Sequence, residues 1–144
     1  MKTVLLIGLA LFSLRSIGQR NDSWKVVLNN QEIVYSNLSN EPRHTRTISK
    51  AEIKKAGFLE VIYFTHNAHF NWFKRLLVFD ENDSQVYTIG FNNSTRLPNS
   101  FLKSLFAKTK KLVIYALVEP SDINKTHIIK QKRSHLCTLV LNEY

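Results

Sequence analysis

Residues that cross-link or bend a chain are scarce in this sequence of 144 residues, which has one cysteine, three prolines and four glycines. A lone cysteine, Cys137, excludes an intramolecular disulfide, so the fold must be stabilised by packing. A domain of this size can bury a sufficient core without such cross-links. Cys137 lies in an alternating apolar stretch, and we expect it to be a small buried hydrophobe. A nucleophile or an intermolecular disulfide is the alternative.

Long apolar runs are absent after residue 18, and the only one lies at the N-terminus. It covers residues 4–14, follows the positive charge of Lys2 and precedes the small residues Ser16 and Gly18. This pattern is typical of a signal peptide cleaved after Gly18 or Gln19. The run is too short to span a bilayer, which needs about 20 apolar residues, and no cysteine directly follows it for lipid attachment. We therefore expect a signal peptide at 1–19, a single domain at 20–144, and a periplasmic or secreted protein that is not membrane-spanning after cleavage.

Acidic residues are in the minority, with 11 Asp and Glu against 20 Lys and Arg and a net charge of +9. Such a balance favours anionic partners, among them lipid head groups, lipopolysaccharide and acidic glycans. Because the protein is expected to be exported, we do not expect nucleic acid to be its partner.

Short β-branched and aromatic segments separated by turn residues make up the expected domain. They predict a mainly β fold, an antiparallel β-sandwich of about eight strands with two short helices. The expected strands are 24–28, 31–35, 45–48, 58–65, 72–79, 85–91, 111–118 and 128–141, and the expected helices are 50–56 and 99–107.

Local signals support several of these elements. Asn29 and Asn30 tolerate positive φ and predict a two-residue hairpin turn. Ser49 and Glu52 have capping-box spacing, and Gly57 is the expected helix stop. The chain twice runs from a polar segment through a short helix into a strand, which is a weak internal echo. The segment 128–141 is long for one strand, so we expect a bulge or bend near Ser134 and His135.

Candidates for chemistry are few. His66 and His69 form an i, i+3 pair in a predicted loop, but zinc needs a third or fourth ligand, so exposed or packed loop histidines are favoured over a metal site. Asp80, Glu81 and Asp83 cluster in a predicted turn without the spacing of a calcium loop. No nucleophile motif occurs. We therefore assign no catalytic residue, no metal and no cofactor, and an enzyme is not favoured.

The densest basic run after the signal peptide is formed by Lys130, Lys132 and Arg133. A solvated edge strand protected by its charges is the simpler interpretation. The functional alternative is an anion-binding strip, which Lys110 and Lys111 would extend if the strands 111–118 and 128–141 pair.

Three segments together resemble a group of small exported proteins of unknown function from Gram-negative bacteria. They are Gly57–Val61, Trp72–Leu76 continuing through Phe79 and Asp80, and Arg133–Leu139. The resemblance implies a bacterial source and a periplasmic or extracellular location. It implies no activity.

The leading hypothesis is a non-enzymatic exported interaction or envelope-associated module whose partner is an anionic envelope component or a protein. A small exported hydrolase or metal-dependent enzyme using His66, His69 or Cys137 is the second hypothesis. A structural or inhibitor-like domain that presents a strand edge is the third.

Overall fold

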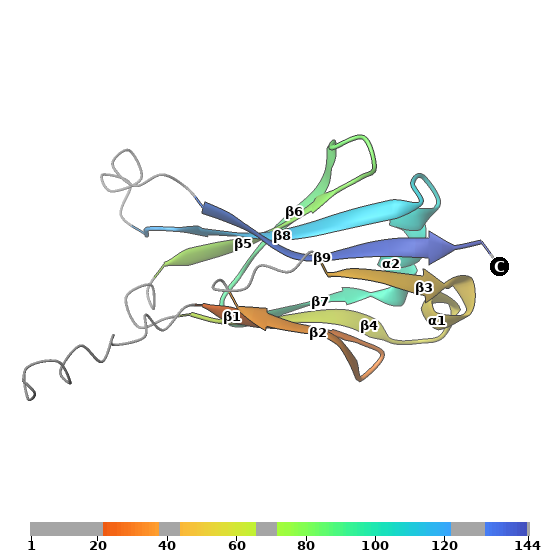
Figure 1. The fold of residues 1–144 in the computed structure, drawn as a ribbon, viewed down its shortest axis with the longest axis horizontal. Helices are drawn as coiled ribbons and strands as arrows, with labels where there is room; N and C mark the ends of the chain where they lie inside the picture. Colours follow the sequence, from red (N-terminus) through yellow and green to blue (C-terminus); the bar gives the residue numbers. More distant parts are fainter. Residues whose placement is uncertain (1–21, 38–43, 66–71, 122–131, 144) are drawn as a thin grey trace, which may run out of the picture.

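The structure is a computed structural model that describes residues 22–37, 44–65, 72–121 and 132–143. Over these residues the chain forms nine strands and two short helices, arranged as two sheets packed face to face (Figure 1). The predicted fold class is confirmed: the protein is a mainly β, mostly antiparallel sandwich. No helix within the described ranges has the length and apolar character needed to cross a membrane.

The smaller sheet has four strands in the order β2-β1-β4-β7. Their bounds are β1 Ser23–Leu28, β2 Gln31–Asn37, β4 Phe58–Phe64 and β7 Ser94–Pro98. The larger sheet has five strands in the order β3-β9-β8-β5-β6. Their bounds are β3 Thr45–Ser49, β5 Phe73–Phe79, β6 Gln85–Phe91, β8 Lys111–Glu119 and β9 Lys132–Asn142.

The predicted hairpin at Asn29 and Asn30 is confirmed, and the predicted turn at Asp80–Asp83 joins β5 and β6 in a second hairpin. Asn29 and Asn30 have φ values of 51° and 68°, the left-handed conformation of a two-residue turn between β1 and β2. The turn between β5 and β6 depends on Asp80, whose Oδ1 accepts hydrogen bonds from the backbone N–H groups of Asn82 and Ser84, both at 2.9 Å. Strong local turn chemistry therefore fixes these two pairings.

Three details differ from the sequence prediction. β7 was not expected; it is a short edge strand that ends in Pro98, and an edge position tolerates a residue without an N–H donor. β3 pairs with β9 in parallel, the one parallel pair among the described strands. The first helix, α1 (Lys50–Lys54), ends before Gly57, which has no positive φ and so is not a left-handed helix stop. A Cβ at Gly57 would instead collide with the side chain of Asn29, so the position requires glycine for close approach.

The core lies between the two sheets and is filled by alternating residues of the central strands. Its fully buried members include Trp24 on β1, Tyr63 on β4, Leu112 and Ile114 on β8, and Cys137 on β9. The prediction of Cys137 as a buried small hydrophobe is confirmed. Its thiol is free, and burial raises its pKa to about 12.

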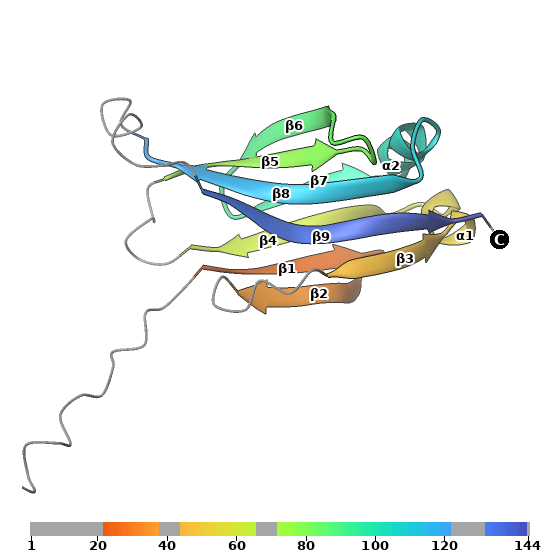
Figure 2. The ribbon, with the colours of Figure 1, turned by 45° about the horizontal axis from the view of Figure 1, so that its top comes forward.

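The internal echo corresponds to two strand–helix–strand units that connect the sheets in opposite directions. The unit β3-α1-β4 passes from the five-stranded to the four-stranded sheet, and β7-α2-β8 returns through α2 (Asn99–Phe106). The capping box predicted at α1 is present, with Ser49 and Glu52 satisfying each other's backbone N–H groups. Figures 1 and 2 both show the two helices beside each other at one end of the sandwich. Two similar strand–helix–strand units thus form one end of the molecule.

Candidate functional site

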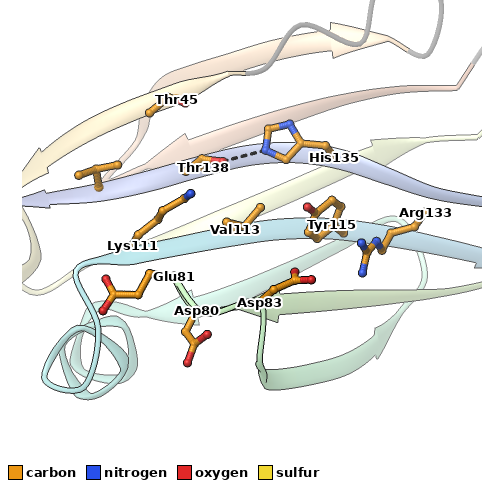
Figure 3. Close-up of a pocket in the computed structure, with 11 residues that line it drawn as sticks. Thr45, Asp80, Glu81, Asp83, Lys111, Val113, Tyr115, Arg133, His135 and Thr138 are labelled. Atoms are coloured by element: carbon orange, nitrogen blue, oxygen red, sulfur yellow. Dashed lines mark hydrogen bonds between the residues drawn. The ribbon is translucent and has the colours of Figure 1, made fainter.

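A groove of about 750 Å³ lies on the outer face of the five-stranded sheet. β8 and β9 form its floor, and the turn between β5 and β6 and the start of β3 flank it (Figure 3). Its volume falls within the range of small-molecule sites. The lining residues are Thr45, Asp80, Glu81, Asp83, Lys111, Val113, Tyr115, Arg133, His135, Thr138 and Val140.

Strand alternation explains the contribution of β8. Leu112, Ile114 and Ala116 are fully buried between the sheets, so the residues between them, Val113 and Tyr115, face outward. The same alternation could have predicted the outward position of Tyr115 from the sequence.

A bulge explains the contribution of β9. Tyr115 is opposite His135 while Ile114 is opposite Cys137, so Leu136 is the extra residue in β9. The bulge predicted near Ser134 and His135 is therefore confirmed at the adjacent position. Because Leu136 and Cys137 are both buried, His135 and Thr138 line the same outer groove despite their odd spacing. Their side chains are joined by a hydrogen bond of 2.9 Å between His135 Nε2 and Thr138 Oγ1.

Arg133 occupies one end of the groove on an aromatic platform. The carbon at the centre of its guanidinium lies 4.2 Å from the ring centroid of Tyr115 and 4.9 Å from that of Phe79. The two rings are perpendicular, with centroids 5.6 Å apart. Such contacts hold the planar cation in place while its N–H edge stays available to an in-plane acceptor.

Two other arginines that lie on an aromatic ring each form an ion pair with a glutamate. Arg96 lies 4.3 Å from the Phe58 ring and pairs with Glu60 at 2.9 Å. Arg75 lies 5.7 Å from the Phe73 ring and pairs with Glu119 at 3.0 Å. Arg133 has two rings, yet no carboxylate of the described residues forms an ion pair with it.

The other end of the groove contains Lys111, and the acidic turn lies along one rim (Figure 3). Lys111 lies four residues from Tyr115 on β8, which corresponds to about 13 Å along the strand. Of the turn carboxylates, Asp80 is bonded within the turn and Glu81 accepts the backbone N–H of Lys110 at 3.3 Å. The groove therefore presents separate cationic groups on its floor and carboxylates on one rim.

The residues of the predicted anion-binding strip do not form one continuous run. β8 and β9 do pair, but their antiparallel register places Lys111 opposite Val140 and Arg133 opposite Leu117, at different ends of the ladder. Lys111 and Arg133 both line the groove. Lys110 is exposed and forms an ion pair of 2.6 Å with Glu143. Of the remaining two predicted residues, Lys132 is opposite Val118 in the ladder, and Lys130 lies outside the described residues.

The weak metal candidates, His66 and His69, also lie outside the described residues. Within the described ranges, no group of three or more His, Cys, Asp and Glu side chains is arranged to hold a metal ion. Comparison of the chain with models of protein families, with curated proteins and with solved structures finds no match.

Proposed function

We propose that the protein is an exported, non-enzymatic binding module whose groove on the five-stranded sheet recognises an anionic group of its ligand, a carboxylate or a phosphate. The observation that carries this proposal is Arg133, the one described arginine on an aromatic platform that lacks a carboxylate from the described residues. A ligand anion would take the place that Glu60 takes beside Arg96 and Glu119 takes beside Arg75. The exported location is the expectation from the signal-peptide pattern of residues 1–19, and it is part of the proposal.

The chemistry of the guanidinium supports an oxyanion as the recognised group. Two parallel N–H bonds match a carboxylate or a phosphate, and these charge-assisted pairs are roughly twice as strong as neutral hydrogen bonds. The rings of Tyr115 and Phe79 restrict the side chain before binding, so less rotamer entropy is lost when the anion arrives.

The carboxylates on the rim narrow the ligand class. Asp83 and Glu81 flank the same groove, and they would repel a ligand with closely spaced negative charges along its length. A ligand whose anionic group is isolated, with neutral polar groups elsewhere, suits this arrangement better than heparin or nucleic acid.

Binding is favoured over catalysis by the state of the nucleophiles. The thiol of Cys137 is buried in the core, and its raised pKa keeps it protonated. Thr138 lines the groove, but it is only 7% exposed and its hydroxyl is engaged in the hydrogen bond with His135.

A nitrogen-15 NMR titration with inorganic phosphate and with acetate tests the proposal. We expect saturable shifts of the amides around Tyr115 and His135 and of the Arg133 Nε–H, and Arg133→Gln should weaken binding at least tenfold. Arg133→Lys should also weaken it, because lysine keeps the charge but loses the fork. Arg46→Gln, an exposed arginine on β3 of the same sheet, is the matched control and should leave the affinity unchanged. Equal affinities of the Arg133 and Arg46 variants would refute the proposal.

A further inference from the structure

The helical end of the sandwich contains a second, smaller hollow, of about 200 Å³. Each helix contributes residues at the same spacing, i, i+3 and i+4, and Leu141 near the end of β9 completes the lining. The two strand–helix–strand units therefore build this hollow from equivalent helix faces. The lining residues are Lys50, Ile53 and Lys54 from α1, Lys103 and Phe106 from α2, Ala107 directly after it, and Leu141.

The floor of the hollow is apolar and its rim is cationic. Ile53 and Phe106 are 4% and 7% exposed, so they belong to the hydrophobic core and also form the base of the hollow. All polar lining residues are lysines, and their side chains are exposed. Long lysine side chains cover apolar surface with their stems while their ammonium groups stay in water.

Further exposed lysines follow the two helices in the sequence, and two carboxylates of this end are bonded to neighbouring residues. Glu52 accepts hydrogen bonds from the backbone and hydroxyl of Ser49, and Glu143 pairs with Lys110. The hydrogen bond from Lys110, together with the charges of Lys110 and Lys50, holds the pKa of Glu143 below its ordinary value. Lysines therefore outnumber carboxylates at this end of the molecule. Its other exposed lysines are Lys55 and Lys108.

From this arrangement we propose that the helical end attaches the protein to an anionic lipid surface. Lys50, Lys54 and Lys103 would contact lipid phosphates while an apolar lipid segment enters the hollow over Ile53 and Phe106. Clustered lysines beside an apolar patch have the charge and polarity of a site for anionic membranes. The site is separate from the Arg133 groove, and the inference does not depend on the proposed function of that groove.

A lipid suits the hollow better than an acidic protein segment does. A peptide backbone brings N–H and C=O groups that need partners when they are buried. The residues lining the hollow offer only apolar side chains and flexible ammonium groups, which suit hydrocarbon and diffuse phosphate charge.

Co-sedimentation of the mature protein with vesicles tests the attachment. We expect binding to vesicles of phosphatidylcholine mixed with phosphatidylglycerol and none to phosphatidylcholine alone. The rim variant Lys54→Gln/Lys103→Gln should lose roughly 20-fold in affinity. The control variant Lys25→Gln/Arg46→Gln removes the same net charge from the sheets and should lose less than threefold. If the two variants lost affinity for the vesicles equally, only the net charge would matter, and the proposed lipid site would be refuted.

A second pair of variants tests the position of the hollow. Ala107 is exposed and lines the hollow, so replacing it should leave the fold intact. Ala107→Glu should abolish vesicle binding, whereas Ala107→Gln, of the same shape without the charge, should retain it within about threefold. Similar binding of these two variants would refute the site. Arg133→Gln should bind vesicles like the wild type, so failure of the groove and failure of the lipid site are distinguishable.

Discussion

The buried side chain of Asn99 gives the sharpest test of how the helical end is held together. It is 2% exposed, and the two hydrogens of its Nδ2 are shared among three acceptors: the backbone oxygens of Glu52 and Lys55, at 3.2 and 2.9 Å, and Asn29 Oδ1, at 2.8 Å. Its backbone N–H donates to the Gly57 oxygen at 2.9 Å. One amide thus connects the start of α2, the end of α1 and the β1-β2 turn.

Asn99→Ala should destabilise the protein by about 2–4 kcal/mol, since a buried acceptor left without its donor costs about 1–3 kcal/mol. Glu52 O keeps a second donor, Asn29 Nδ2 at 2.8 Å, so the loss falls mainly on Lys55 O and on Asn29 Oδ1. Asn99→Asp should cost more, because it places a carboxylate against these same acceptors.

Urea denaturation followed by the fluorescence of the buried Trp24 measures the change. We expect a lower midpoint with an unchanged slope, and a fall of the melting temperature of roughly 10 °C. Ser100→Ala, at the exposed neighbouring position, is the control and should differ from wild type by less than about 0.5 kcal/mol. A loss below about 1 kcal/mol for Asn99→Ala would refute the reasoning.

Three further predictions concern buried groups. Burial lowers the pKa of Lys74, and the charge of Asp22 opposes this effect. The unfolded chain therefore binds the proton of this lysine more tightly than the folded protein does. As the pH increases from the lowered pKa to the ordinary one, the free energy of unfolding of the wild type should rise. Lys74→Met should lack that rise in urea midpoints measured from neutral pH to about pH 10. Cys137, with its pKa raised to about 12, should react with a thiol reagent only at the rate of unfolding, and rapid labelling of the native protein would contradict its burial. Trp24→Phe should cost about 1–3 kcal/mol in urea denaturation, because Trp24 Nε1 donates to Leu136 O at 3.2 Å; a smaller loss would show that the bulge does not need this bond.

The elements of the fold could be predicted where the determining signal is local. The Asn29-Asn30 turn and the Ser49-Glu52 capping box both depend on residues within a few positions of one another. The strand β7 was missed because polar residues precede it and Pro98 ends it, and only pairing with β4 makes it a strand. The parallel pairing of β3 with β9 joins segments about ninety residues apart, and no local pattern encodes it.

The candidate site, too, could be predicted from local sequence signals but not where it depends on the pairing of distant strands. Arg133 stands out in the sequence by its charge run, but Tyr115 and Phe79 come from two other strands, and their contact with it depends on register. The charge run suggested a continuous strip with Lys110 and Lys111, whereas the antiparallel ladder separates the two ends. A list of basic residues therefore predicted which residues line the groove only in part. It could not predict which arginine forms no ion pair with a carboxylate of the described residues.

One irregularity in β9 connects both proposed sites. With strict alternation after the outward-facing His135, the outward positions would be 137, 139 and 141, and Thr138 would turn into the core. The extra residue, Leu136, reverses this, so Thr138 and Val140 line the groove while Leu139 is fully buried and Leu141 reaches the hollow between the helices. Its carbonyl oxygen accepts the indole N–H of Trp24 from the opposite sheet, which stabilises the bulge from within the core. The core hydrogen bond and the two surface sites are therefore coupled through a single strand, and a change that removes the bulge should disturb both sites together.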